Sequence, residues 1–168
     1  MNAFVATTTQ FDSRLLRSTL GSFASGVVIV SAAYEGREHG MTANSFTSVS
    51  LTPALVLFCT HNDARMTRVL EPGMELGLSV LASEQQSVSR QFAGRGNDAA
   101  PVEFAWVRGV PVILGAVAHL VCRVTESRVA GDHTVQIAEV EHFERCEKAP
   151  LVFWNGTYAQ LASTPTRT

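Results

Sequence analysis

Hydroxyl and amide side chains are concentrated in one short segment, residues 40–50, whose sequence is Gly-Met-Thr-Ala-Asn-Ser-Phe-Thr-Ser-Val-Ser. Apolar runs that predict core strands flank this segment, so its polar groups need hydrogen-bond partners. Such side chains can cap turns of their own backbone, or they can bind a polar ligand that has a flat ring edge. Composition alone favours the turn-forming explanation. The polar members are Thr42, Asn44, Ser45, Thr47, Ser48 and Ser50.

His133 is a second candidate for chemistry, because it directly follows Gly131 and Asp132. Gly-Asp is ordinary turn chemistry, so composition alone favours a solvated loop histidine. The remaining histidines and the cysteines show no Cys-x-x-Cys motif or other metal-ligand spacing, and we expect no metal site. We expect free thiols in a reducing cytoplasm. These residues are His39, His61, His119, His142, Cys59, Cys122 and Cys146.

The bulk composition indicates one domain. A chain of 168 residues with 46% apolar residues can bury its own core, and we expect a single domain over residues 1–168 with flexible tails at 1–10 and 163–168. The net charge of −2 and the absence of a basic stripe argue against nucleic-acid binding. Only 17% of the residues are charged, which favours burial of further surface against a partner. We expect neither a signal peptide nor a membrane span.

Strands predominate among the predicted elements. Apolar spacing and capping residues predict short helices over residues 11–20, 64–70 and 83–92. A long hairpin is predicted from two of the strands, with a loop of four or five residues at 130–133. Residues 94–104 are predicted to form a polar loop, and Trp106 and Trp154 to lie in the core. The predicted strands are 27–33, 39–44, 55–59, 74–81, 116–129, 134–143 and 151–154.

These elements do not alternate regularly as βαβ units, which argues against a doubly wound parallel sheet. We therefore predict a mainly β fold, an antiparallel barrel or sandwich with short helices inserted between strands.

Four stretches, in order along the chain, make this sequence similar to the short-chain flavin reductase family, the reductase components of two-component flavin monooxygenases. Any one stretch alone is weakly specific, but the ordered set extends over about residues 13–161. The stretches are Phe-Ala-Ser-Gly-Val-Val-Ile-Val at 23–30, Gly-Met-Thr-Ala-Asn-Ser-Phe-Thr-Ser-Val-Ser-Leu-Thr-Pro at 40–53, Val-Ser-Arg-Gln-Phe-Ala-Gly at 88–94, and Gly-Asp-His at 131–133 followed by Gly-Thr-Tyr at 156–158.

The resemblance implies an antiparallel split β-barrel of Greek-key type. It also implies a homodimer, because the family's flavin pocket lies close to the subunit interface. The implied activity is reduction of FMN or FAD by NADH or NADPH, with the reduced flavin passed to a partner monooxygenase. The chemistry is hydride transfer between two rings held about 3–3.5 Å apart. Because the cofactors supply the reactivity, the protein needs donors for the developing negative charge rather than a general base.

Roles for individual residues also follow from the resemblance. His133 is expected where the nicotinamide docks. Asp132 is expected to form the turn that positions it, or less plausibly to contact the nicotinamide amide. Tyr158 is expected to contact the nicotinamide, contact the dimer partner or close the barrel. The expected flavin contacts are Thr42, Ala43, Asn44 and Ser45 along the ring, Ser48, Val49 and Ser50 along the ring or the ribityl chain, and Phe92 near the pocket.

The phosphate site is where this sequence departs from the family pattern. Ala64 and Met66 replace the small hydroxyl residues that relatives often carry after the strand at 55–59, while Arg65 and Thr67 remain. A helix beginning near Ala64 can still offer N–H groups to a phosphate, and Arg65 can add a bidentate contact or be an ordinary solvated residue. Arg90 is a second phosphate contact or, preferably, an exposed helix residue. The choice between FMN and FAD stays open.

Three functions remain compatible with the sequence. The first is an NAD(P)H:flavin oxidoreductase, which the Gly-Asp-His stretch favours. The second is a flavin-binding protein of the same barrel without reductase activity, used for flavin storage or electron relay. The third is an unrelated small β-barrel binding module in which residues 40–50 only form turns, and the ordered set of stretches disfavours it.

Overall fold

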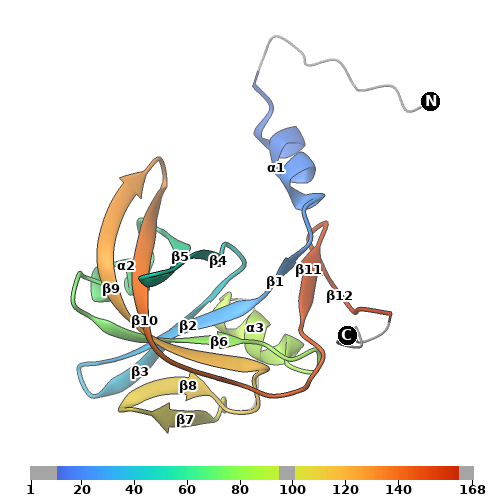
Figure 1. Ribbon diagram of the computed structural model, residues 1–168. Helices are drawn as coiled ribbons and strands as arrows, with labels where there is room; N and C mark the ends of the chain where they lie inside the picture. Colours follow the sequence, from blue (N-terminus) through green and yellow to red (C-terminus); the bar gives the residue numbers. More distant parts are fainter. Residues whose placement is uncertain (1–10, 95–100, 163–168) are drawn as a thin grey trace.

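The computed structural model describes residues 11–94 and 101–162 (Figure 1). The predicted tails at 1–10 and 163–168 lie outside the described residues, and so does most of the predicted loop at 94–104. Helices in the described part are α1 (Ser13–Gly21), α2 (Arg65–Val69) and α3 (Gln86–Phe92). The strands are β1 (Ser25–Gly26), β2 (Val28–Tyr34), β3 (Arg37–Ala43), β4 (Thr47–Leu51), β5 (Ala54–His61), β6 (Glu75–Val80), β7 (Phe104–Val107), β8 (Val110–Ile113), β9 (Ala118–Ala130), β10 (His133–Arg145), β11 (Val152–Trp154) and β12 (Thr157–Ala159).

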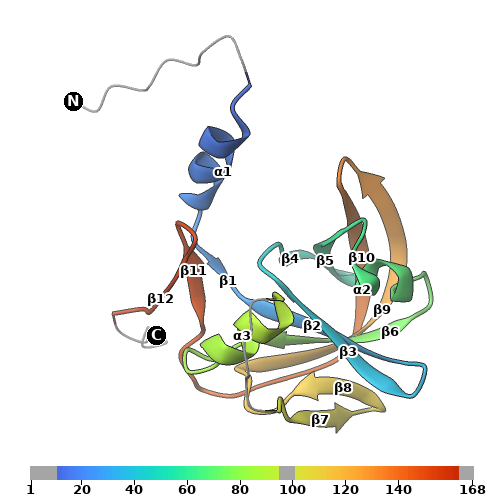
Figure 2. The same ribbon diagram turned by 180° about the vertical axis from the view of Figure 1, so that it is seen from behind.

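A seven-stranded antiparallel sheet in the order β3-β2-β6-β9-β10-β5-β4 forms the body of the protein. The sheet curls, because Ala43 of β3 and Phe58 of β5 belong to one hydrophobic cluster although their strands lie near opposite ends of the strand order. Figures 1 and 2 show this curl from both sides. The Ser45 hydroxyl accepts a hydrogen bond of 2.9 Å from the Cys59 N–H, which ties the β3–β4 connection to β5. The predicted mainly β split-barrel fold with short helices is confirmed.

The long hairpin is confirmed as β9 and β10, but its turn is shorter than predicted. Ala130 pairs with His133, so only Gly131 and Asp132 form the turn. Gly131 has a φ of +67°, in the left-handed region that glycine adopts without a steric cost. His133 pairs with His61 of β5 as well. It is therefore the first residue of a strand held between two neighbours, not a residue of a solvated loop.

The sequence prediction missed the hairpin of β7 and β8. Its turn residues Arg108 and Gly109 both have positive φ, as a two-residue hairpin turn requires, and an Arg-Gly pair between two apolar runs is a weak turn signal. Buried β8 packs on the sheet, where the Ser31 hydroxyl donates a hydrogen bond of 2.6 Å to the Pro111 carbonyl. Trp106 and Trp154 were expected in the core, but they are 55% and 47% exposed.

Helix boundaries differ from the prediction at α3. The helix begins at Gln86 rather than near Ser83, because the Gln85 side chain accepts the Ala82 N–H and holds the preceding turn. Helix α1 begins at Ser13, inside the predicted range of 11–20, and Asp12 caps it, because the Asp12 carboxylate accepts the N–H groups of Arg14 and Leu15. No helix among the described residues is long and apolar enough to cross a membrane.

The three cysteines are free thiols. Cys122 is buried in the barrel core, and loss of solvation of the thiolate raises its pKa to about 12. This thiol is therefore an inert packing residue at neutral pH.

Gly77 permits the close crossing of β6 and β8, and this predicts a steep stability cost for Gly77→Ala. A Cβ at position 77 would lie 2.5 Å from the Pro111 carbonyl oxygen, which is backbone and cannot rotate away. We expect a loss of about 1–3 kcal/mol in the free energy of unfolding, measured with urea. Gly26→Ala is the matched control, because its Cβ would meet nothing within 4 Å. Equal stability of the two variants would contradict the assigned crossing.

Candidate functional site

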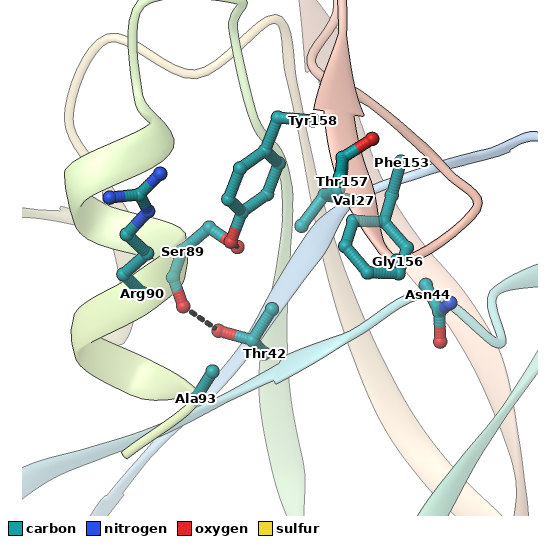
Figure 3. Close-up of a pocket in the computed structure, with 10 residues that line it drawn as sticks. All are labelled: Val27, Thr42, Asn44, Ser89, Arg90, Ala93, Phe153, Gly156, Thr157 and Tyr158. Carbon is teal, nitrogen blue, oxygen red and sulfur yellow. Dashed lines mark hydrogen bonds between the residues drawn. The ribbon is translucent and has the colours of Figure 1, made fainter. Parts of the chain in front are cut away.

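A cavity of about 530 Å³ lies between α3, the end of β3 and the strand pair β11–β12 (Figure 3). Its walls therefore come from segments that are remote in sequence and meet only in the fold. The lining residues are Val27, Thr42, Asn44, Ser89, Arg90, Ala93, Phe153, Gly156, Thr157 and Tyr158.

Gly40 sets how closely α3 approaches β3. A Cβ at Gly40 would lie 2.6 Å from the Phe92 ring, so only glycine leaves room for that ring. Phe92 packs edge-on against Phe104 at a centroid distance of 6.0 Å and belongs to the second hydrophobic cluster. Phe92 is not among the residues that line the cavity, and its contact with Phe104 supports α3 instead. The last turns of α3 thereby bring Ser89 and Arg90 to the wall of the cavity.

Hydrogen bonds converge on Ser89, which is 1% exposed. The Thr42 hydroxyl donates to the Ser89 carbonyl at 2.6 Å, shown as a dashed line in Figure 3. The Tyr158 hydroxyl donates to the Ser89 side-chain oxygen at 2.9 Å. These two bonds connect β3 and β12 to the same residue of α3, so they fix the spacing of the cavity walls.

Arg90 is the one charged residue among those that line the cavity in the described part of the chain. Its guanidinium carbon lies 5.6 Å from the centre of the Tyr158 ring, within the range of a cation–π contact. None of the described residues that line the cavity carries a carboxylate. The site therefore combines hydroxyl and amide groups with one positive charge, which favours an electron-rich or anionic ligand.

Residues 40–50 form strands rather than a run of turns. Residues 40–43 end β3, residues 47–50 lie in β4, and only residues 44–46 connect the two strands. Of the expected ring contacts in this segment, Thr42 and Asn44 line the cavity, while the Ala43 side chain is buried in the core. The turn-forming explanation is therefore wrong for most of the segment.

Strand β4 carries the expected ribityl contacts on an irregular edge. The register between β4 and β5 shifts between Ser48 and Ser50, which leaves Val49 without a partner and 46% exposed. The Ser50 side chain accepts the Thr52 N–H at 3.1 Å. None of these three residues lines the cavity.

A second polar group lies where β5, α2 and the β9–β10 turn meet. The rings of His61 and His133 pack edge-on with centroids 5.2 Å apart. Asp132 Oδ1 lies 2.7 Å from His133 Nδ1. The Thr67 hydroxyl donates a hydrogen bond of 2.6 Å to the His61 carbonyl, so this hydroxyl proton is already used within the turn. The Arg65 side chain is exposed.

The structure thus divides the expected site residues into two groups. Thr42, Asn44 and Tyr158 meet at the cavity. Asp132, His133 and the α2 residues gather at the hairpin turn, which lies well away from β11 and β12 in both views (Figures 1 and 2). Ser45 lies between the groups, because it bonds to Cys59, two residues before His61.

The sequence analysis missed several cavity residues. Ser89 belongs to the third stretch of the resemblance but was given no role. Its neighbour Arg90 is exposed on α3, as preferred, and it also lines the cavity. Thr157 belongs to the Gly-Thr-Tyr stretch of the resemblance but was given no role, and the local pattern around Phe153 does not point to a site. They become neighbours of Thr42 only because β11 pairs with β1.

The family model described as Flavin reductase like domain matches residues 20–162. An NADH-dependent flavin reductase of Rhodococcus sp is 47% identical over 150 residues, covering 87% of this chain and 85% of the relative. The reductase subunit HsaB of a flavin-dependent monooxygenase from Rhodococcus jostii is 34% identical, covering 89% of this chain and 78% of the relative. The solved structure of flavin reductase PheA2 in its native state superposes with a TM-score of 0.88 at 39% identity, covering 91% and 100% of the two chains.

The Asp132–His133 contact predicts an unusual titration. The hydrogen bond from His133 lowers the pKa of the Asp132 carboxyl below its usual value. The Asp132 carboxylate that accepts this hydrogen bond is therefore present above the lowered pKa and is protonated as the pH falls through it. A carboxyl NMR titration should give Asp132 a midpoint below the usual value of an aspartate, and His133→Gln should raise this midpoint. An unchanged midpoint in the variant would contradict the contact.

Proposed function

The chain belongs to the flavin reductase like family, and from this premise we propose that it is an NADH-dependent flavin reductase. It transfers a hydride from NADH to FMN or FAD and passes the reduced flavin to a separate monooxygenase. The observation that carries this proposal is that the family match over residues 20–162 includes every residue lining the cavity, from Val27 to Tyr158.

The cavity fits a flavin ring in size and in donor chemistry. Its volume of about 530 Å³ lies within the range of about 300–1,000 Å³ usual for small-molecule sites. Val27 and Phe153 offer apolar surface to a flat ring, while Thr42, Asn44 and Tyr158 offer polar groups for a ring edge. When bound, the flavin supplies the hydride-accepting centre of the reaction.

The role of the chain in this reaction is to bind and orient. We assign Thr42, Asn44 and the neighbouring backbone at Ala43 and Ser45 to the polar edge of the ring. Arg90 is placed to stabilise negative charge, because it is the one cation, with no carboxylate beside it, among the described residues that line the cavity. Ser48, Val49 and Ser50 extend the surface along β4 toward the ribityl chain. Phe92 fixes the position of α3.

The second polar group is assigned to the nicotinamide and phosphate ends of the ligands. His133 is held by Asp132 and by the His61 ring, so its orientation is fixed before a ligand binds. Arg65 provides an exposed guanidinium for a flavin phosphate. Thr67 orders the turn that presents Arg65. Tyr158 closes the cavity at β12 through its hydrogen bond to Ser89.

The proposed cellular setting follows from the relatives and the thiols. A relative named as the reductase subunit of a flavin-dependent monooxygenase supports a monooxygenase partner for this chain. Three free cysteines fit a reducing cytoplasm. We also propose that the chain acts as one domain over residues 1–168. Val28 of β2 belongs to one hydrophobic cluster and its neighbour Ile29 to the other, so a single strand contributes to both clusters.

Turnover tests the proposal directly. Purified protein with NADH and excess FMN or FAD should oxidise NADH, followed by the loss of nicotinamide absorbance. His133→Ala should raise the KM for NADH at least about tenfold while changing the flavin Kd less than about twofold. His39→Ala, which alters a partly buried histidine of β3 outside the site, is the matched control. Flavin binding without turnover would indicate a binding protein, and no flavin binding would overturn the proposal.

We further propose a homodimer, because α1 leaves its apolar residues uncovered. No residue of α1 is buried by the described chain. Leu20 is 65% exposed, and Phe23, just after the helix, is 81% exposed. Exposed apolar patches of this kind on a soluble chain mark association sites. A second copy covering α1 also accounts for the low share of charged residues.

Leu20→Asp should weaken the dimer, because it places a charge in the surface that the second copy covers. Light scattering at micromolar concentration should give a dimer for the original protein and a monomer for the variant. Val129→Asp, which alters an equally exposed residue at the end of β9, should remain dimeric. A monomeric original protein would contradict the proposal.

A further inference from the structure

The imidazole rings of His61 and His133 lie edge-on where β5 pairs with the start of β10, with centroids 5.2 Å apart. In the proposed function His133 meets the nicotinamide, whereas His61 is only its packing neighbour. The side chains are 52% and 45% exposed, so a ligand can reach both rings. What each ring offers to such a ligand depends on which of its nitrogens carries the proton.

The backbone fixes the proton of His61 on Nε2. The Asp63 N–H donates to His61 Nδ1 at 3.2 Å, so Nδ1 is an acceptor. The Asp63 carboxylate lies 3.9 Å from the same nitrogen, which is too far for a hydrogen bond that would place a proton there. A neutral imidazole has one N–H group, and in His61 this group is therefore at Nε2. His61 offers the ligand a hydrogen-bond donor.

The neighbouring carboxylate fixes the opposite tautomer in His133. Asp132 Oδ1 lies 2.7 Å from His133 Nδ1, and a carboxylate oxygen only accepts, so Nδ1 carries the proton. The pKa of the Asp132 carboxyl is lowered by this hydrogen bond, so the carboxylate is ionised at neutral pH. The Nε2 atom of the neutral His133 ring is then an acceptor. The two rings thus present a donor and an acceptor side by side.

A primary carboxamide is complementary to this pair of groups. Its carbonyl oxygen accepts and its NH₂ group donates, and both are attached to one carbon. A carboxylate or a phosphate group carries acceptors and would need a donor from each ring. The nicotinamide ring of the proposed substrate NADH carries a carboxamide. The amino edge of adenine also places a donor beside an acceptor, so the experiment must separate these two parts of the dinucleotide.

We propose that His61 recognises the substrate directly, with its Nε2–H donating to the carbonyl oxygen of the nicotinamide carboxamide while His133 Nε2 accepts one of the amide N–H groups. The inference rests on the proposed function and deepens it, because it adds a specificity-determining residue to the site of His133. Asp63 and Asp132 are positioning residues, since each holds the tautomer of one ring.

The test is H61F, which keeps an aromatic ring to pack against His133 and removes the N–H donor. H61Q retains a side-chain N–H donor, and H39F is the matched control because it makes the same change in β3, away from this pair. Three hydride donors are compared. They are NADH, its thionicotinamide analogue, in which a weakly accepting sulfur replaces the carbonyl oxygen, and reduced nicotinamide mononucleotide, which has no adenine.

H61F should raise the KM for NADH at least about fivefold and change kcat less than about twofold, because one hydrogen bond to the substrate is lost. H61Q should recover part of this loss. The original protein and H39F should favour NADH over the thionicotinamide analogue at least about fivefold in kcat/KM, and H61F should lose most of this preference.

Two kinetic outcomes would overturn the inference. A KM for NADH in H61F within about twofold of the original value would show that His61 acts only by packing. A rise in KM that disappears with reduced nicotinamide mononucleotide would place adenine, rather than the carboxamide, at His61.

A binding measurement separates this inference from the proposed function. NMR of the imidazole nitrogens should show the proton on Nε2 of His61 and on Nδ1 of His133, and NAD⁺ should shift the His61 Nε2 signal. If the protein oxidises NADH with a flavin but NAD⁺ leaves this signal unchanged, the inference fails and the proposed function stands. If no flavin supports NADH oxidation, the proposed function fails. The same shift with NAD⁺ would then still support the contact, and its absence would overturn it.

Discussion

The hydrogen bonds at Ser89 hold the candidate site together. This residue of α3 receives the Thr42 hydroxyl from β3 on its carbonyl and the Tyr158 hydroxyl from β12 on its side chain. Each bond contributes only about 0.5–1.5 kcal/mol to stability, but together they join three segments that lie far apart in sequence. Gly40 is required for the same reason, because any side chain there would push Phe92, and with it α3, away from β3. The cavity exists only while these contacts hold its walls.

The local charge at this cavity favours an anionic ligand. Arg90 is the one charged residue among the described residues that line the cavity, and none of these residues carries a carboxylate. The net charge of the chain is −2, so an anionic ligand is attracted by this local group rather than by the whole protein.

Much of the fold follows from local sequence, and much of the site does not. The β-branched run beginning at Val27 and the long hairpin were predictable, because alternation and turn residues act over a few positions. The β7–β8 hairpin was missed, since its Arg108-Gly109 turn is a weak signal beside a polar loop. Thr42 and Asn44 were predicted from the resemblance. Ser89 and Thr157 were not, because their places at the cavity depend on how α3 and β12 pack near β3, and no local pattern encodes contacts between segments so far apart in sequence.

The most direct test of the account is a crystal structure of the protein with FMN bound. The account predicts the isoalloxazine ring in the cavity between α3 and β12, with its polar edge within hydrogen-bond distance of Thr42 or Asn44 and the Tyr158–Ser89 bond retained. A ring bound elsewhere, for example against Arg65 and His133 with the cavity empty, would contradict the assignment of the site.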